Sequence, residues 1–291
     1  MIFSTLNLKI NFYFQQAYAG DSIVAILAGQ LAGAAAGARG PTGPFELSIG
    51  FLAAGALLAT FLWTENKAEK AASVDIDGED SSTEPTIRDA VKVVKGDPKI
   101  MLVGAVQSLF EAAMYIFVLQ WPPAITAAVG TAFGGASTPY GTVFSCFMAS
   151  CLLGSTIFSQ LGQRNVPTEV STSAMLIVAT IAMTIGAWIA SSGSAVAMPL
   201  AALVGAFFAF EGCVGMYFPS IGTLRSKYVP DSHRGVIMNL FGIPLNALVV
   251  TVFLSIKRLG VAGALSVSAG SLGLASVAML KLRSMTKAEA E

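Results

Sequence analysis

Charged residues are scarce in this sequence. Only 12% of its 291 residues are Asp, Glu, Lys or Arg, whereas soluble globular domains contain about 25%. Hydrophobic residues make up 54% of the chain. Because a soluble domain of this size could not bury so much apolar surface, the composition excludes a soluble enzyme and predicts an integral membrane protein whose surroundings are the lipid bilayer.

The sequence also lacks an excess of charge of one sign and any pattern typical of a metal site. Its 17 basic and 17 acidic residues balance, so we expect no nucleic-acid partner. Cys146, Cys151 and Cys213 lack metal-ligand spacing, and the single histidine, His233, lies in a polar stretch beside Arg234. The sequence therefore predicts no metal, no cofactor and no enzymatic centre.

Apolar stretches long enough to cross a bilayer follow one another along the chain. A spanning helix needs about 20 mostly apolar residues, and short polar breaks separate stretches of that kind. We expect about eight transmembrane helices in an all-α membrane protein. The expected spans are residues 20–38, 45–63, 99–121, 139–161, 169–190, 196–221, 235–256 and 261–281.

A long polar stretch divides these spans into two plus six. We expect five segments: residues 1–16 without an assignment, 17–63 with two spans, 64–97 as a polar linker, 98–283 with six spans, and 284–291 as a tail. Major-facilitator transporters have two six-helix halves, each containing inverted three-helix repeats. The pattern is therefore typical of a major-facilitator helical bundle without its first four helices.

The second half of the linker has an amphipathic pattern. Ile87, Val91 and Val94 recur at helical spacing within residues 86–95. This spacing predicts a short helix that lies on the membrane surface.

Basic residues gather on one side of the predicted membrane. The other side has Arg39, Lys257 and Arg258 alone. Because Lys and Arg near span ends are retained in the cytoplasm, we expect both termini and the 64–97 loop to be cytoplasmic. The residues on that side are Lys67, Lys70, Arg88, Lys92, Lys95, Lys99, Arg164, Arg225, Lys227, Arg234, Lys281, Arg283 and Lys287.

Four stretches, residues 104–122, 144–155, 211–220 and 228–246, together resemble the molybdate-anion transporter family. The likeness extends from about Tyr18 to about Leu282. It implies a major-facilitator fold, a multi-pass location in the cell membrane and uptake of an oxyanion, which is molybdate in the members that give the family its name.

The sequence departs from that family in two respects. It begins where members enter their fifth helix, as a truncated gene model would, and residues 1–16 have no match that we identify. Members also commonly carry an Arg in the eleventh helix where this chain has Gly242. The second departure removes a cation that could bind the substrate.

Two acidic residues are expected near the middle of membrane spans, Glu111 in the third and Glu211 in the sixth. A charge there costs about 2.5–3.5 kcal/mol on insertion scales, so such residues usually face the bundle interior and serve a function. Gln107, Glu111 and Tyr115 follow at four-residue steps, which predicts that they share one face turned to the inner cavity. The candidate residues of the transport pathway are Gln107, Glu111, Tyr115, Glu211 and, from the family-like stretch 228–246, Asn239 and Asn246.

A carboxylate does not itself attract an oxyanion. Glu111 and Glu211 would carry a coupling proton or hold a basic residue in place; the alternative is that they join helices by hydrogen bonds.

Arg164 and Arg225 are candidate gating residues, against the alternative that they only fix the topology. Asp21 is expected to cap the first span.

Three functions are compatible with this sequence. The first is a secondary transporter of molybdate or a related oxyanion; the second is a carrier of another small solute such as a sugar; the third is a truncated membrane protein that transports nothing. Because every Lys and Arg is expected in a loop or at a span end, we expect this chain by itself not to support molybdate uptake, in contrast to a longer form.

Overall fold

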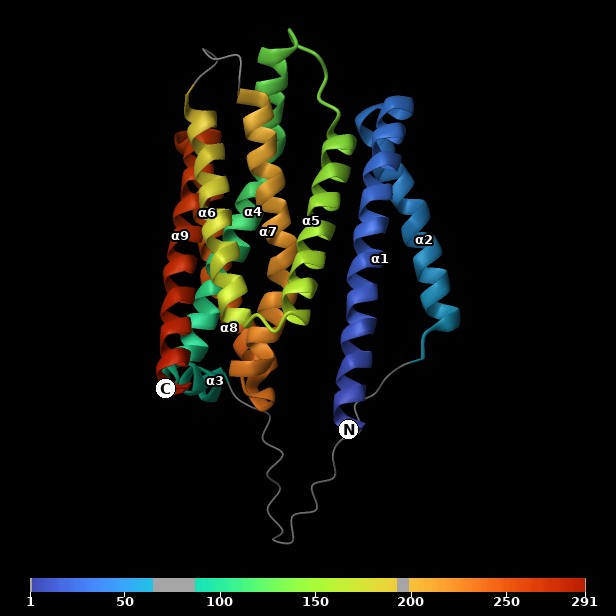
Figure 1. Ribbon diagram of the computed structural model, residues 1–291. Helices are drawn as coiled ribbons and strands as arrows, with labels where there is room; N and C mark the ends of the chain where they lie inside the picture. The colour runs from blue at the N-terminus through green and yellow to red at the C-terminus, as the bar shows by residue number, and fades with distance from the viewer. Residues whose placement is uncertain (1, 65–86, 193–198, 291) are drawn as a thin grey trace.

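The computed structural model describes residues 2–64, 87–192 and 199–290, and within these ranges all regular elements are helices. Figure 1 shows long helices running side by side, with the start of α1 and the end of α9 at the same end of the bundle. The elements are α1 (Ile2–Arg39), η1 (Gly40–Thr42), α2 (Gly43–Leu62), α3 (Ile87–Gly96), α4 (Pro98–Ala132), α5 (Tyr140–Gln163), α6 (Thr168–Ser191), α7 (Pro199–Tyr228), η2 (Asp231–His233), α8 (Arg234–Leu254) and α9 (Ile256–Ala290).

Seven stretches of the described chain are helical, long and apolar enough to cross a membrane. The first, residues 20–62, contains both α1 and α2, joined at η1, so it accounts for two spans. The predicted all-α membrane bundle with a two-plus-six order of spans is therefore confirmed. Most of the expected 64–97 linker lies outside the described residues.

Six helices, α4 to α9, form one bundle. In it α4, α6, α7 and α9 pack in a ring, while α5 packs outside α7 and α8 packs outside α4. The ring of Phe117 lies 5.0 Å from that of Phe207 and 4.9 Å from that of Phe210, measured between centroids. Because lipid tails are as apolar as these side chains, such close packing and interhelical hydrogen bonds hold the bundle together.

Glycines let α5 approach its neighbours closely. A Cβ on Gly154 or on Gly215 would lie 1.8 Å from a carbonyl oxygen of the facing helix, so only glycine fits between α5 and α7. On the other side of α5, a Cβ on Gly141 would lie 2.3 Å from the carbonyl oxygen of Gly29 in α1. Ser145 stabilises the same α1–α5 contact, since its hydroxyl donates to the carbonyl of Ile26 at 2.8 Å.

The α1–α2 hairpin lies beside the six-helix bundle, with α1 against α5 (Figure 1). α2 packs on α1 and η1 and leaves most of its apolar side chains exposed. The first two spans thus lie at the side of the bundle and present an exposed apolar face. The exposed side chains of α2 include Phe45, Ile49, Phe51, Leu52, Leu57, Leu58, Phe61 and Leu62.

Several expected boundaries are wrong because the helices are longer. α1 begins at Ile2, so residues 1–16 are not separate from the first span, and Asp21 lies in mid-helix and cannot be its cap. α9 ends at Ala290, so the expected tail 284–291 continues the last helix. The expected break before that span is a kink, at Gly260 (φ 61°).

Two spans continue beyond their expected ends at residues 121 and 221, through or past prolines. α4 continues past Pro122 and Pro123, and α7 continues past Pro219 to Tyr228, seven residues beyond its expected end at 221. Proline removes one backbone N–H, but in a bilayer an unwound backbone would lose many more hydrogen bonds, so the helix is retained.

The amphipathic helix predicted over 86–95 is confirmed as α3. Its apolar side packs against α4 and α8 through Ala90, Val93 and Val94. Ile87, which we placed on that face, is exposed.

Candidate functional site: an ion pair between α4 and α7

Four polar side chains meet between α4 and α7. The phenol of Tyr217 donates to Glu111 Oε1 at 2.9 Å, and Arg225 Nη2 donates to the same oxygen at 3.2 Å. Arg225 Nε donates to Gln107 Oε1 at 3.0 Å. Two residues of α4 thus bind one cation of α7.

The order of these residues along the two helices explains the geometry. Gln107 and Glu111 are one turn apart on α4, so their side chains leave the helix in nearly the same direction. Tyr217 and Arg225 are eight residues apart on α7, a rise of about 12 Å, and the long arginine side chain covers part of that separation. Since α7 extends to Tyr228, Arg225 belongs to a helix and not to the loop where we had placed it.

The cluster is largely removed from water. Gln107 and Tyr217 are buried, and the side chains of Arg225 and Glu111 are 25% and 19% exposed. The ring of Phe110 stacks on that of Tyr217, with centroids 3.9 Å apart. A charge pair in such surroundings is strong only while both partners are present, since removal of one leaves an uncompensated charge.

Arg225 keeps unused binding capacity. A guanidinium has five N–H donors in a planar fork, and within the described chain Gln107 and Glu111 accept from two of them. The remaining donors have the geometry that recognises the oxygens of an anion such as a carboxylate or phosphate. Arg225 can therefore donate to a further acceptor that reaches it from its exposed side.

The structure brings together Gln107 and Glu111 from the predicted pathway set and Arg225 from the predicted gating set. Tyr115 does not join them, because its side chain is 48% exposed and makes no hydrogen bond within the described residues. The prediction that Tyr115 shares a face with Gln107 was wrong, because a step of eight helical residues rotates the side chain by about 80° about the helix axis.

The other candidates lie apart from the cluster. Glu211 is buried, 6% exposed, next to the close α5–α7 contact, and it has no polar partner among the described residues. Asn239 and Asn246 are exposed on α8, and Asn246 Nδ2 donates to its own helix at the carbonyl of Gly242, 2.8 Å away. Arg164 follows the end of α5 and is exposed, so its role in gating stays a prediction.

A second polar cluster was not predicted. Glu169 Oε1 accepts from Lys227 Nζ at 2.5 Å and from the phenol of Tyr228 at 2.6 Å, and that phenol lies 3.0 Å from Thr286 Oγ1. These contacts join the start of α6 to the ends of α7 and α9. Glu169 and Lys227 lie at the ends of apolar stretches, where a charge indicates only topology, and nothing in their spacing indicates that they pair.

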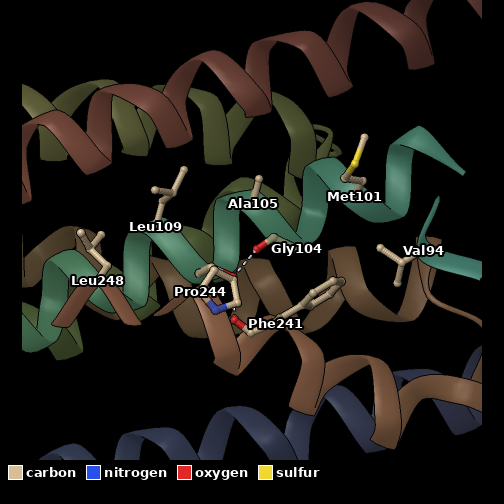
Figure 2. Close-up of a pocket in the computed structure, with 9 residues that line it drawn as sticks. Val94, Met101, Gly104, Ala105, Leu109, Phe241, Pro244 and Leu248 are labelled. Carbon is tan, nitrogen blue, oxygen red and sulfur yellow. Dashed lines mark hydrogen bonds between the residues drawn. The ribbon is translucent and has the colours of Figure 1, made fainter. Parts of the chain in front are cut away.

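An apolar groove of about 330 Å³ lies between α4 and α8, beside α3. Figure 2 shows Met101, Gly104, Ala105 and Leu109 of α4 facing Phe241, Pro244 and Leu248 of α8. Its one side-chain hydroxyl, that of Ser108, donates to the carbonyls of Gly104 and Phe241 at 2.8 and 2.7 Å. The groove therefore offers no free side-chain donor to an anion, unlike the cluster on the α7 side of α4.

A family model matches residues 3–217; it is named MFS_5 and described as sugar transporters with 12 transmembrane spans. Residues 1–16, which we expected to match nothing, thus fall largely within the match. A protein from Xenopus tropicalis named "Molybdate-anion transporter" is 28% identical over 237 residues, 81% of this chain and 48% of the relative. Proteins of the same name from Takifugu rubripes and Danio rerio are each 27% identical over 72% of this chain.

These matches confirm the resemblance inferred from the sequence. The chain spans about half the length of the curated relatives that it matches. No solved structure gives a significant match.

Proposed function

The chain belongs to the MFS_5 family of major-facilitator proteins, and on this premise we propose that it takes part in the uptake of molybdate or a related oxyanion across the cell membrane. The observation that carries the proposal is the guanidinium of Arg225. It is largely buried between two membrane-spanning helices, and it has N–H donors that no described residue accepts. The name of the relatives, molybdate-anion transporter, supports the same substrate class.

The chemistry of an oxyanion requires such a residue. An ion that leaves water must exchange its hydration for donors and positive charge, since unpaired burial costs several kcal/mol. We expected every Lys and Arg in a loop or at a span end, and Arg225 does lie in the last turn of α7. Its side chain nevertheless reaches Gln107 and Glu111 of α4 and is only 25% exposed, which weakens the electrostatic reason for expecting no uptake by this chain.

A sugar is the second candidate substrate, favoured by the description of the family model. A neutral polyol would use amides and aromatic rings, and the chain places Asn239, Asn246 and Tyr115 at exposed positions of its spans. These groups are scattered, however, whereas Arg225 is part of an organised cluster. We therefore rank the oxyanion above the sugar.

Uptake by molybdate-starved cells tests the proposal. Cells that express the protein should accumulate labelled molybdate above the vector control, and excess tungstate, a tetrahedral dianion of similar size, should compete. Arg225→Gln should return uptake to the control level, whereas Arg283→Gln, at an exposed position of α9, should not. Uptake of labelled hexoses with no uptake of molybdate would reverse the ranking, and uptake of neither would overturn transport as the function.

The orientation in the membrane is part of the proposal. Figure 1 places the start of α1, the end of α9 and α3 at one end of the bundle, and the bias of Lys and Arg supports a cytoplasmic location for that end. Epitope tags at both termini should bind antibody only after the cells are permeabilised. Binding to intact cells would reverse the orientation.

A further inference from the structure

The apolar groove between α4 and α8 lies on the other side of α4 from the ion pair with α7. We propose that this groove binds one acyl chain of an anionic phospholipid, whose headgroup lies against the basic face of α3. The inference is independent of the proposed function, because it concerns a different surface of α4 and a different ligand.

The lining of the groove has the chemistry of a site for an acyl chain. Met101 and Leu109 present apolar side chains to it, and Met101 is exposed, so the groove is open to the surroundings of the protein. The hydroxyl of Ser108 already donates to the carbonyls of Gly104 and Phe241. A ligand in the groove therefore has to be apolar itself, as a hydrocarbon chain is.

The groove also lies at the depth of one leaflet of the bilayer. α4 begins at Pro98, and its part of the groove extends from Met101 to Leu109, which is from about 5 to about 16 Å along the helix. One leaflet contributes about half of a hydrocarbon core of about 30 Å. Figure 2 shows Val94 of α3 at the Met101 end of the groove and Leu248 near Leu109 at the other. A chain in the groove therefore runs from the membrane surface toward the bilayer centre.

α3 carries an apolar stripe that extends the groove. Ile87, Val91 and Val94 recur at steps of four and three residues and so share one face. Val94 lines the groove, whereas Ile87 is 65% exposed. The stripe therefore continues the apolar surface along α3, where the second acyl chain of the same lipid can lie.

A separate face of α3 is basic. Arg88, Lys92 and Lys95 also recur at steps of four and three residues, and all three are exposed. The one acidic residue of the helix, Asp89, bonds Lys92 at 3.3 Å, which leaves an excess of positive charge. Long basic side chains can reach the headgroup region while the helix lies on apolar surface. Each Lys or Arg near the membrane surface favours an anionic lipid by about fivefold, so the charge selects an anionic headgroup over a neutral one.

Quenching of Trp fluorescence by lipids with brominated acyl chains can locate the lipid. Met101→Trp and Leu248→Trp place reporters on the two walls of the groove, and Ala53→Trp, at an exposed position of α2, is the matched control. The proteins are reconstituted in nanodiscs of phosphatidylcholine with increasing fractions of brominated phosphatidylglycerol or brominated phosphatidylcholine. The signal of the unmodified protein, which has three Trp residues, is subtracted.

The two lipids should differ only at the groove. From the dependence of quenching on lipid fraction, both groove reporters should bind phosphatidylglycerol at least about fivefold more strongly than phosphatidylcholine. Ala53→Trp should be quenched equally by the two lipids. The preference should fall at high salt, where surface charges are screened.

Charge variants decide whether α3 supplies the preference. In the Met101→Trp background, Arg88→Gln combined with Lys95→Gln should remove it, because Lys92 and Asp89 then cancel. Lys257→Gln combined with Arg258→Gln should leave the preference unchanged, since these exposed residues at the start of α9 lie at the opposite end of the bundle (Figure 1).

Each contrary result is distinct. A preference at Met101→Trp without one at Leu248→Trp would place the lipid beside α3 and outside the groove, and equal quenching by both lipids would show that no headgroup is selected. Weak quenching by either lipid would show that something else, such as a further protein helix, covers the groove. Any of these results would overturn the inference and leave the proposed function standing. Thermal melting checks the fold of each variant, and Leu109→Trp replaces a reporter that lowers the melting temperature.

Discussion

Two acid–base pairs near the end of α7 are built from similar residues and differ in what they leave free. In the Glu169–Lys227 pair the acid is buried at 7% exposure, the lysine is 49% exposed, and Tyr228 donates to the same carboxylate oxygen. In the Glu111–Arg225 pair both charges are largely buried, and the guanidinium keeps unused donors.

The difference separates a structural contact from a binding site. A lysine is a compact point charge that its solvent shell satisfies, whereas an arginine offers a planar fork that can hold two acceptors at once. The first pair joins three helix ends with its polar groups satisfied. The second pair is open to exchange of one acceptor for another, and this is the property that a transporter of anions requires.

The largest expected effect comes from removal of the Arg225 charge, and removal of the Lys227 charge is its control. Arg225→Gln should reduce molybdate uptake at least about tenfold, as loss of a charge-assisted contact of 1.4 kcal/mol or more implies, and Arg225→Lys should restore only part of it. Lys227→Gln should leave uptake within about twofold. Uptake is normalised to the amount of protein at the cell surface, and equal losses for Arg225→Gln and Lys227→Gln would abolish the distinction between the pairs.

Removal of the two acids should affect stability unequally. Glu111→Ala leaves a mostly buried guanidinium with one acceptor, which should lower stability by about 2–4 kcal/mol. Glu169→Ala leaves a lysine that water can solvate and should cost about 1–2 kcal/mol. Thermal melting in nanodiscs measures both, and a larger loss for Glu169→Ala would show that the second pair is the more deeply desolvated one.

Gly242→Arg tests the departure from the family pattern. A Cβ at this position of α8 would meet Asn246 Nδ2 at 3.8 Å, an ordinary van der Waals distance, so the first atom of a side chain fits there. A second cation should strengthen molybdate binding several-fold, as a further charge-assisted contact of about 1 kcal/mol would. Unchanged or weaker binding, measured with labelled molybdate, would show that Arg225 alone supplies the charge.

The smallest expected effects come from the two phenols. Tyr217→Phe removes one donor to Glu111 and should change molybdate affinity by about fivefold, equivalent to a hydrogen bond of about 1 kcal/mol. Tyr228→Phe removes the equivalent donor to Glu169 and should leave the affinity unchanged. A change in affinity for Tyr228→Phe and none for Tyr217→Phe would place the substrate nearer to the second pair.

The sequence predicted best what depends on local pattern. The spans, their two-plus-six order and α3 follow from runs of apolar residues and helical spacing, because a bilayer obliges each apolar segment to satisfy its own backbone hydrogen bonds. The helix ends were predicted less well, because that same obligation extends helices through Pro122, Pro123 and Pro219. Gln107 and Glu111 were recognised because a polar side chain in an apolar span is conspicuous.

What the sequence by itself determined is that this chain crosses a membrane and carries Glu111 and Gln107 inside a span. Which cation meets them was decided only by the tertiary structure, because pairing depends on the register of α4 against α7, over a separation of more than 100 residues. Arg225 and Lys227 are two positions apart in the same last turns of α7, and the sequence gives no reason to prefer either. The helical repeat points them to different neighbours, so one meets α4 and the other meets α6.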